Sequence, residues 1–286
     1  MNYEVGSLWR KWDLHVHTPF SILNNQFGFD FDNYFYNLFS KAIANKIYVI
    51  GITDYYSIEG YKKVKEYLSD NKKLKKLFKK EVSSDSKYIE KIRNITVMPN
   101  IEFRLNTVIS VAGKNNQSKL QVHVIFSDLV PVSDIETQFL NSIHFTNGQK
   151  EVVLTKNAVI NYGKEMIESG ACPPHEKDPE FVGYNQIAVD LNEIVRVLKN
   201  SFKGRYIIVG VEEDITRVLW RDQASAVRKN YYENCDAIFS SNPKSIKWFA
   251  SKNAVITLKK KRHVSGALIL IQLKNCLKLM KTDFYG

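Results

Sequence analysis

The sequence predicts an α/β fold built on a largely parallel sheet, either open or closed into a barrel. Apolar runs of strand length alternate along the chain with segments whose apolar residues recur at helical spacing. Such alternation is typical of βα units, in which a helix connects neighbouring parallel strands. No internal repeat and no Gly/Ser-rich linker interrupts the pattern, so we expect one domain up to about Val255.

The expected strands are short runs that are apolar or rich in β-branched residues. The first holds a His-x-His pair and should end at Pro19. The run KIYVIGIT and the run LQVHVIF are continuous enough to be buried strands. Five further strands are expected after the first, over residues 46–53, 94–111, 120–126, 205–211 and 235–241. Asn242-Pro243 should end the last strand.

Helices are expected between these strands. Apolar residues at helical spacing indicate a helix over residues 30–45, and Ser57 is a candidate N-cap for a long basic helix that reaches residue 80. Gly170 should close a further helix. That helix covers residues 155–169, and two more helices are expected over residues 185–201 and 220–234.

The composition excludes several classes of protein. With 44% hydrophobic and 25% charged residues among 286, the chain is neither disordered nor fibrous. Its longest apolar run, residues 267–271, is far shorter than the ~20 residues of a membrane span, and the first residues lack an apolar signal core. The three cysteines are scattered, which indicates neither a disulfide framework nor a thiolate zinc site. We therefore expect a cytoplasmic protein without membrane association.

The net charge of +11 is unevenly distributed. Residues 257–286 contribute six of the eleven charges, and residues 62–80 hold nine lysines interleaved with apolar residues. We interpret those lysines first as the solvated face of an amphipathic helix, with a nucleic-acid contact as the alternative.

The strongest chemical signal is the pair His15 and His17. Side chains two residues apart in a strand point to the same face, so both imidazoles can bind one metal ion. Pro19 places the pair at the carboxyl end of its strand. A His-x-His pair alone is a weak signal.

Three further residues stand at comparable positions. Asp54 follows the strand of residues 46–53, Glu102 lies in the segment MPNIEF, and His123 lies inside an apolar strand. Alone, Asp54 reads equally well as a helix N-cap or turn residue. For Glu102 a surface strand position, and for His123 a core imidazole, is each favoured over metal ligation when the residue is taken alone. Together they favour a metal site, because the carboxyl ends of parallel strands meet at one rim.

Arg104 is a candidate phosphate ligand. It lies two residues beyond Glu102, on the same face of the strand, and a guanidinium can bind a phosphate with two hydrogen bonds. A surface or ion-paired arginine is the alternative.

These motifs, in this order, resemble the PHP (polymerase and histidinol phosphatase) superfamily of metal-dependent phosphoesterases. The segments that carry the resemblance are DLHVHTPFS, GITDYYSIEGY, MPNIEF and QVHVIFSD. The flanking segments LNNQFG and RDQASAVRKNYYENCDAIFSSNPK are similar, more narrowly, to the PHP domain at the N-terminus of TrlF-type proteins, in which an SMC-like or AAA-like ATPase follows. The resemblance covers roughly residues 7–250.

The resemblance implies a distorted (β/α)7 TIM-like barrel over residues 7–256, with two or three divalent ions (Mn, Zn or Fe) at the carboxyl ends of its strands. By position it assigns metal ligation to His15, His17, Asp54, Glu102 and His123. The first catalytic candidates are accordingly Glu102, Asp54 and Arg104.

Two departures from the family pattern affect this expectation. Tyr55 stands where many relatives have a histidine, and the closing Gly-Ser-Asp-x-His motif is missing after Ile256. A shift of two nucleotides near the lysine run 259–261 would allow the codons of residues 262–270 to encode Gly-Ser-Asp-Ser-His in place. We therefore expect residues 257–286 to be an out-of-frame tail, the barrel to be incomplete at its C-terminal end, and the parent protein to continue into an ATPase.

The expected function is hydrolysis of a phosphate ester. The TrlF-type resemblance implies a nuclease that acts on nucleic-acid phosphodiesters together with an SMC/AAA-like ATPase. The alternative is a catalytically impaired regulatory or interaction module, because the missing motif would remove two metal ligands.

Overall fold

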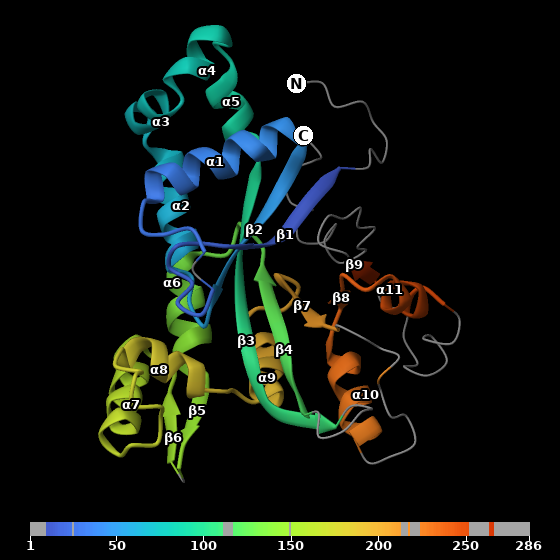
Figure 1. Ribbon diagram of the computed structural model, residues 1–286. Helices are drawn as coiled ribbons and strands as arrows, with labels where there is room; N and C mark the ends of the chain where they lie inside the picture. Colours follow the sequence, from blue (N-terminus) through green and yellow to red (C-terminus); the bar gives the residue numbers. More distant parts are fainter. Residues whose placement is uncertain are drawn as a thin grey trace.

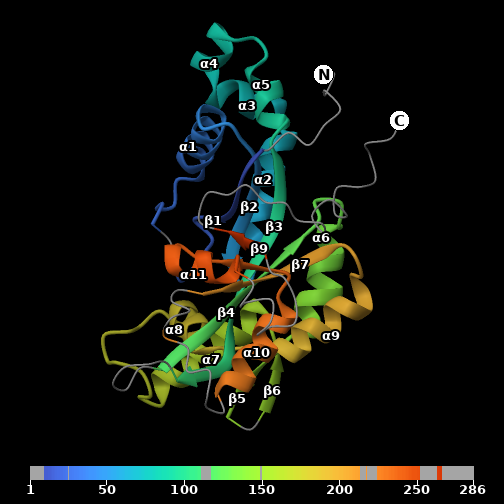
Figure 2. The same ribbon diagram turned by 90° about the vertical axis from the view of Figure 1, so that its right-hand side faces the viewer.

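A seven-stranded mixed sheet, curled into part of a barrel, organises the fold (Figures 1 and 2). The computed structural model describes residues 10–24, 26–110, 117–148, 150–212, 217, 224–251 and 263–265. The predicted α/β class is confirmed. In the described part of the chain no helix has the length and apolar character that crossing a membrane requires.

Strand order explains where the functional residues meet. In spatial order, the strands are β1 (Lys11–His17), β2 (Ile47–Tyr55), β3 (Thr96–Ser110), β4 (Gln117–Phe126), β7 (Tyr206–Val211), β8 (Ala237–Phe239) and β9 (His263–Ser265). β1, β2 and β3 are parallel, as are β7, β8 and β9, whereas β4 is antiparallel to both of its neighbours. β3 and β4 pair as an antiparallel hairpin rather than through a helical crossover. A separate two-stranded sheet joins β5 (His144–Asn147) and β6 (Lys150–Val153).

The helices lie around the curled sheet (Figure 1). They are α1 (Phe31–Ala44), α2 (Glu59–Ser69), α3 (Asn71–Leu77), α4 (Lys79–Ser84), α5 (Tyr88–Arg93), α6 (Val132–Asp134), α7 (Lys156–Glu168), α8 (Pro179–Gln186), α9 (Leu191–Ser201), α10 (Ala224–Asn234) and α11 (Pro243–Phe249). A π-helical turn (Ile135–Phe139) and a 3₁₀ turn (Leu140–Ser142) follow α6.

Two expected helices are divided in the structure. The single basic helix over residues 57–80 is wrong, because Asp70 ends α2 and its side chain accepts a hydrogen bond from the Lys73 amide to begin α3. The helix over residues 185–201 is also wrong in its first turns. Asp190 caps α9 in the same way, through the Asn192 amide. Aspartate favours such caps because its carboxylate satisfies a free backbone donor of the first turn.

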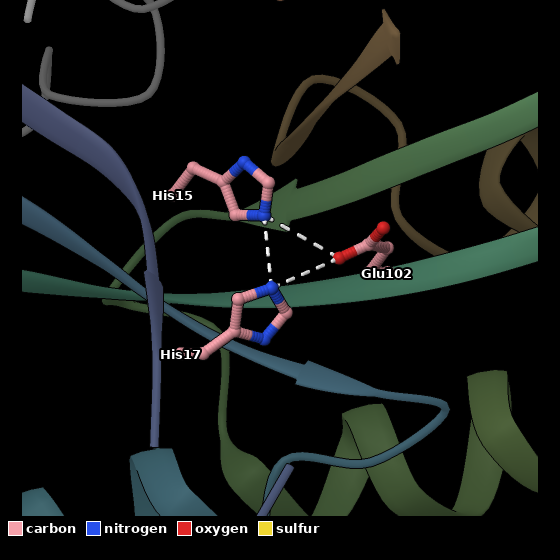
Figure 3. Close-up of side chains that lie close together, drawn as sticks. All are labelled: His15, His17 and Glu102. Carbon is pink, nitrogen blue, oxygen red and sulfur yellow. Dashed lines mark hydrogen bonds and ion pairs between the residues drawn. The ribbon is translucent and has the colours of Figure 1, made fainter. Parts of the chain in front are cut away.

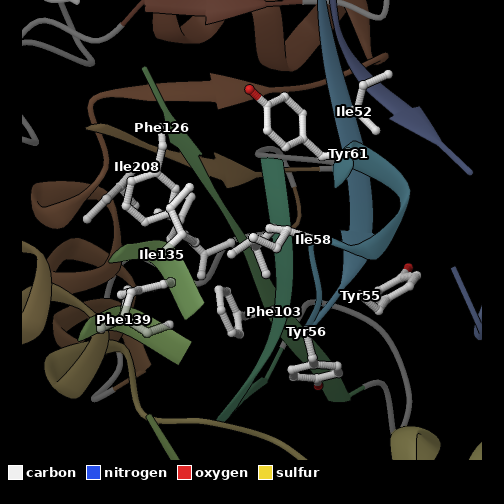
Figure 4. Packing of buried hydrophobic residues seen from close by; sticks show 14 of the residues in the cluster. Ile52, Tyr55, Tyr56, Ile58, Tyr61, Phe103, Phe126, Ile135, Phe139 and Ile208 are labelled. Atoms are coloured by element: carbon white, nitrogen blue, oxygen red, sulfur yellow. The ribbon is translucent and has the colours of Figure 1, made fainter. Parts of the chain in front are cut away.

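Two layers of apolar residues surround the sheet. The larger cluster, on the helix-covered face, contains aromatic residues that are almost completely buried, among them Phe103, Phe126 and Phe139 (Figure 4). The smaller cluster includes Leu14, Met98 and Phe239. Phe239 also contacts two of the histidines described below. The smaller cluster therefore adjoins the candidate site.

Most of the predicted tail lies outside the described residues. The exception is β9, whose backbone pairs in parallel with β8 from Ala237↔His263 to Phe239↔Ser265.

Candidate metal centre

A bulge in β1 directs both histidines to the same face of the sheet. The pairing of β1 with β2 is regular at Asp13↔Ile50 and again at Val16↔Ile52, so two residues of β1 oppose the single residue Gly51. Such a bulge re-aims side chains, and here His15 and His17 project together (Figure 3).

Two residues that sequence reasoning missed accommodate this bulge. A Cβ atom on Gly51 would lie 2.3 Å from the carbonyl oxygen of Leu14, so the position requires glycine. The same carbonyl accepts a 2.7 Å hydrogen bond from the side-chain amide of Asn100 on β3. The glycine in the segment GITD was a signal in the sequence that a neighbouring backbone approaches closely.

Replacing Gly51 by alanine is expected to destabilise the fold by about 1–3 kcal/mol, because the backbone of β1 must move away from the new methyl group. The shift would also separate the two histidines. We expect a lower urea midpoint and weaker metal binding in the same variant. Unchanged unfolding and unchanged metal affinity would show that the close approach of the two strands is unimportant.

Three candidate ligand atoms from two strands, β1 and β3, converge in the site (Figure 3). The Nε2 atoms of His15 and His17 are 3.1 Å apart, and Oε2 of Glu102 lies 3.4 Å from the first and 3.3 Å from the second. Among the described residues these three form the only group of at least three such side chains with ligand-metal spacing. The structure thus brings together three of the five predicted ligands at one point.

These separations fit a divalent ion. Ligand atoms bound at about 2.1 Å are separated by about 3.4 Å in a tetrahedral site and about 3.0 Å between neighbours in an octahedral one. The three measured separations fall within this interval. Imidazole nitrogens with a carboxylate oxygen are a donor set that suits zinc, manganese or iron.

His123 brings a third imidazole to the same carboxylate. Its Nε2 atom lies 3.9 Å from Oε2 of Glu102. The pairing of the strands explains the arrangement, because Tyr55, Glu102 and His123 are successive Cα partners across β2, β3 and β4. The fourth predicted ligand is therefore next to the first three.

Asn100 fixes the tautomer of His123. The amide nitrogen of Asn100 donates to the Leu14 carbonyl and to Oγ1 of Thr53, so its oxygen is free to accept the Nδ1 proton of His123 at 3.2 Å. The Nε2 atom of His123 then carries a lone pair directed toward Glu102. Such an outer hydrogen bond is the usual way in which proteins orient a metal-binding histidine.

Two of the candidate ligand atoms have no hydrogen-bond partner among the described residues. Oε2 of Glu102 and Nε2 of His123 are two of the four buried side-chain polar atoms in the described chain that have no hydrogen-bond partner. Buried polar atoms without partners are rare and costly. A bound cation would satisfy both atoms at once.

The charge states of these residues are those that a metal ligand needs. Burial, opposed only in part by Glu102, lowers the pKa of His123 to about 3, so its imidazole is neutral at physiological pH. Burial alone would raise the pKa of Glu102, but the imidazoles of His123, His15 and His17 outweigh burial and lower it below its ordinary value. Glu102 therefore remains an anion.

The pKa of His123 predicts the pH dependence of the metal-free protein. In the unfolded chain this histidine binds a proton below about pH 6.5, whereas in the folded chain it does so only near pH 3. Its contribution to stability is complete above pH 6.5 and is lost as the pH falls, by about 1.4 kcal/mol per pH unit. Urea unfolding between pH 7.5 and pH 4.5, in the presence of a chelator, measures this slope. His123→Gln should flatten it and His175→Gln, at an exposed position, should not; equal slopes in all three proteins would contradict the assignment.

Aromatic rings border the imidazoles. Phe239 stacks on His15 at 5.6 Å between ring centroids and meets His123 edge to face, while Tyr55 stacks on His17 at 5.3 Å. Tyr55 thus packs against one of the candidate ligands, His17. Burial, and then the charge of Glu102, raise the pKa of Tyr55 to about 12, so its hydroxyl remains protonated. The side chain of His15 is 36% exposed, which leaves the centre open to solvent on that side.

Asp54 lies apart from the three converging ligand atoms. One of its carboxylate oxygens accepts a 2.7 Å hydrogen bond from the Thr18 hydroxyl, and the other accepts one of 2.7 Å from the Gly60 amide. Burial raises its pKa to about 7, against the lowering effect of these bonds. In this arrangement Asp54 ties the loop after β1 to the start of α2.

Arg104 lies at the edge of the site. Its guanidinium is 5.4 Å from the ring centroid of Tyr55, and Nη1 donates a 2.8 Å hydrogen bond to the side-chain oxygen of Asn185. Asn185 was not a candidate in the sequence, because its distance along the chain concealed the contact.

The opposite face of β1 borders a separate cavity of about 490 Å³ beneath α1. Asp13 and Val16 line it from β1. From α1, Tyr34 also lines it and donates a hydrogen bond to the backbone carbonyl of His17. The candidate metal centre and this cavity therefore occupy different faces of the same strand.

Comparison with known proteins adds little to this geometry. No protein-family model matches the chain, and no curated protein matches its sequence. Among solved structures it is similar to a protein from Bifidobacterium adolescentis that is described as a proposed metal-dependent phosphoesterase. The TM-score is 0.40 and the identity 11%, over 89% of this chain and 85% of that one. At this level of similarity, the functional proposal below depends on the metal centre itself.

Proposed function

We propose that the chain is a metal-dependent phosphoesterase. The observation that carries the proposal is the convergence of three imidazole Nε2 atoms on one buried carboxylate oxygen that has no hydrogen-bond partner. Without a cation, this arrangement leaves a buried anion and lone pairs facing one another, at a cost in stability. A bound divalent ion turns the same arrangement into a favourable one.

The residues divide into ligands and groups that contact substrate. His15, His17, Glu102 and His123 would hold the ion, which would supply Lewis-acid activation of a phosphoryl group and of a water molecule. Arg104 would bind a phosphate oxygen through the part of its guanidinium that Asn185 does not hold. Phe239 and Tyr55 restrict water around the imidazoles, which strengthens electrostatic interactions inside the site.

Asp54 is proposed to position the end of β1 rather than to bind the metal ion directly. Its buried carboxylate positions Thr18, the residue next to His17, and so fixes the end of β1. Direct metal ligation by Asp54 would require it to release Thr18 or Gly60. A second ion, which the family resemblance implies, would depend on that release or on ligands outside the described residues.

The substrate class is proposed from the resemblance to TrlF-type PHP domains. A nucleic-acid phosphodiester is the proposed substrate, and an SMC/AAA-like ATPase is the proposed partner. The open side of the centre at His15 supports access by a large substrate.

Hydrolysis of bis(p-nitrophenyl) phosphate tests the proposal, because this diester reports activity without requiring nucleic-acid recognition. We expect activity that depends on Mn²⁺, Zn²⁺ or Fe²⁺ and disappears with a chelator. Inactivity with every metal, in a folded protein, would favour the alternative of a non-catalytic module.

A further inference from the structure

The two short helices α3 and α4 present a face of exposed lysines that form no ion pair with a described residue. The five lysines of this face are all exposed, and none forms an ion pair with a described residue: Lys72, Lys75, Lys76, Lys79 and Lys80. We call this set the lysine face. The opposite side of the same segment packs into the core through Leu74 and Phe78, which are fully buried.

The lysine face differs from its surroundings. Two lysines near it are paired, Lys62 with Glu59 and Glu136, and Lys73 with Asp32. Within the face no acidic residue stands between residues 71 and 80. Like charges three or four residues apart on a helix destabilise it by about 0.2–0.5 kcal/mol per pair. The segment therefore retains a repulsion that an external anion would relieve.

We propose that the lysine face binds the phosphate backbone of a nucleic acid. The face offers charge without apolar contact area, since the large hydrophobic residues that are exposed in the described chain all lie outside α3 and α4. A membrane-binding helix needs an exposed apolar side, and a protein partner needs aromatic or apolar anchors. A hydrated polyanion needs only the lysines. The choice of nucleic acid also rests on the proposed function.

The lysine face is remote from the metal centre. α5 leads into the first residues of β3, and α3 and α4 lie beside it at the same end of the sheet (Figures 1 and 2). Glu102 lies six residues along β3 from Thr96, about 20 Å away. At 3.4 Å per base pair, about six base pairs of a duplex span this stretch of β3 alone. The lysine face is thus an anchoring site rather than part of the reacting centre.

Binding of a fluorescein-labelled DNA duplex of about 30 base pairs, measured by anisotropy in a chelator, tests the proposal. The variant replaces all five lysines of the face by glutamine. A matched control loses the same charge at five other exposed lysines: Lys164, Lys177, Lys199, Lys203 and Lys244. We expect the first variant to lose about tenfold or more in affinity, and its log–log salt slope to fall by up to about 4, while the control stays near the unaltered protein.

The outcomes separate this proposal from the proposed function. Hydrolysis of bis(p-nitrophenyl) phosphate should be unchanged in the variant of the lysine face. A diester molecule that is bound at the metal centre is too small to contact the lysine face as well. If DNA binding depends on the lysine face but the protein does not hydrolyse the diester, the proposal for the lysine face stands and the proposed phosphoesterase function is overturned. Equal weakening in both variants, or no binding of DNA by the unaltered protein, would overturn the lysine face.

Discussion

Glu102→Gln is expected to lower metal-dependent phosphodiester hydrolysis by about 10²- to 10³-fold, the range found when one electrostatic group of an active site is removed. Glutamine keeps the size of the side chain but removes the anion on which three imidazoles converge. The rate with bis(p-nitrophenyl) phosphate at saturating metal measures the effect.

Glu193→Gln is the matched control for this prediction. Glu193 also accepts a hydrogen bond from an imidazole, that of His144, but on α9 and outside the metal centre. It should retain full activity. If the Glu102→Gln variant is as active as this control, the carboxylate of Glu102 has no role in the reaction.

Metal binding should also stabilise the fold. At a free ion concentration of about 100 times Kd, Mn²⁺ or Zn²⁺ is expected to raise the free energy of unfolding by about 2.7 kcal/mol, because the ion binds the folded chain and not the unfolded one. The double variant His15→Ala with His17→Ala should lose this increase. Thermal unfolding with and without metal gives the comparison.

The control for stabilisation removes two histidines elsewhere. His144 and His175 lie outside the cluster of ligand atoms, so alanine at both positions should leave the metal-induced increase intact. An increase lost equally in both double variants would indicate general ion binding by histidines on the surface. In that case the metal-induced stabilisation would not support a specific metal site at His15 and His17.

Local sequence patterns predicted most of the individual elements. Asp30 and Thr155 cap the helices that their positions suggested, and the His-x-His segment is a strand that ends at His17. The division of the basic helix at Asp70 was not predicted from the sequence, because an aspartate inside a run of helical spacing can be either a cap or a polar residue of the helix face.

The side chains that converge in the candidate site were predicted from the sequence, but the residues that support them were not. His15, His17, Glu102 and His123 stood out because imidazoles and acids are unusual in apolar strands. Asn100 and Phe239 did not, because an amide that orients a histidine and a ring that packs on one look like ordinary strand residues. Their roles depend on the pairing across β2, β3, β4 and β8, which no local pattern contains.

The metal content of the purified protein tests the central claim most directly. After loading with Mn²⁺, Zn²⁺ or Fe²⁺ and removal of free ions by gel filtration, elemental analysis should find at least one equivalent of metal per chain. The double variant His15→Ala with His17→Ala should hold none. A folded, unaltered protein that emerges free of metal would contradict the account.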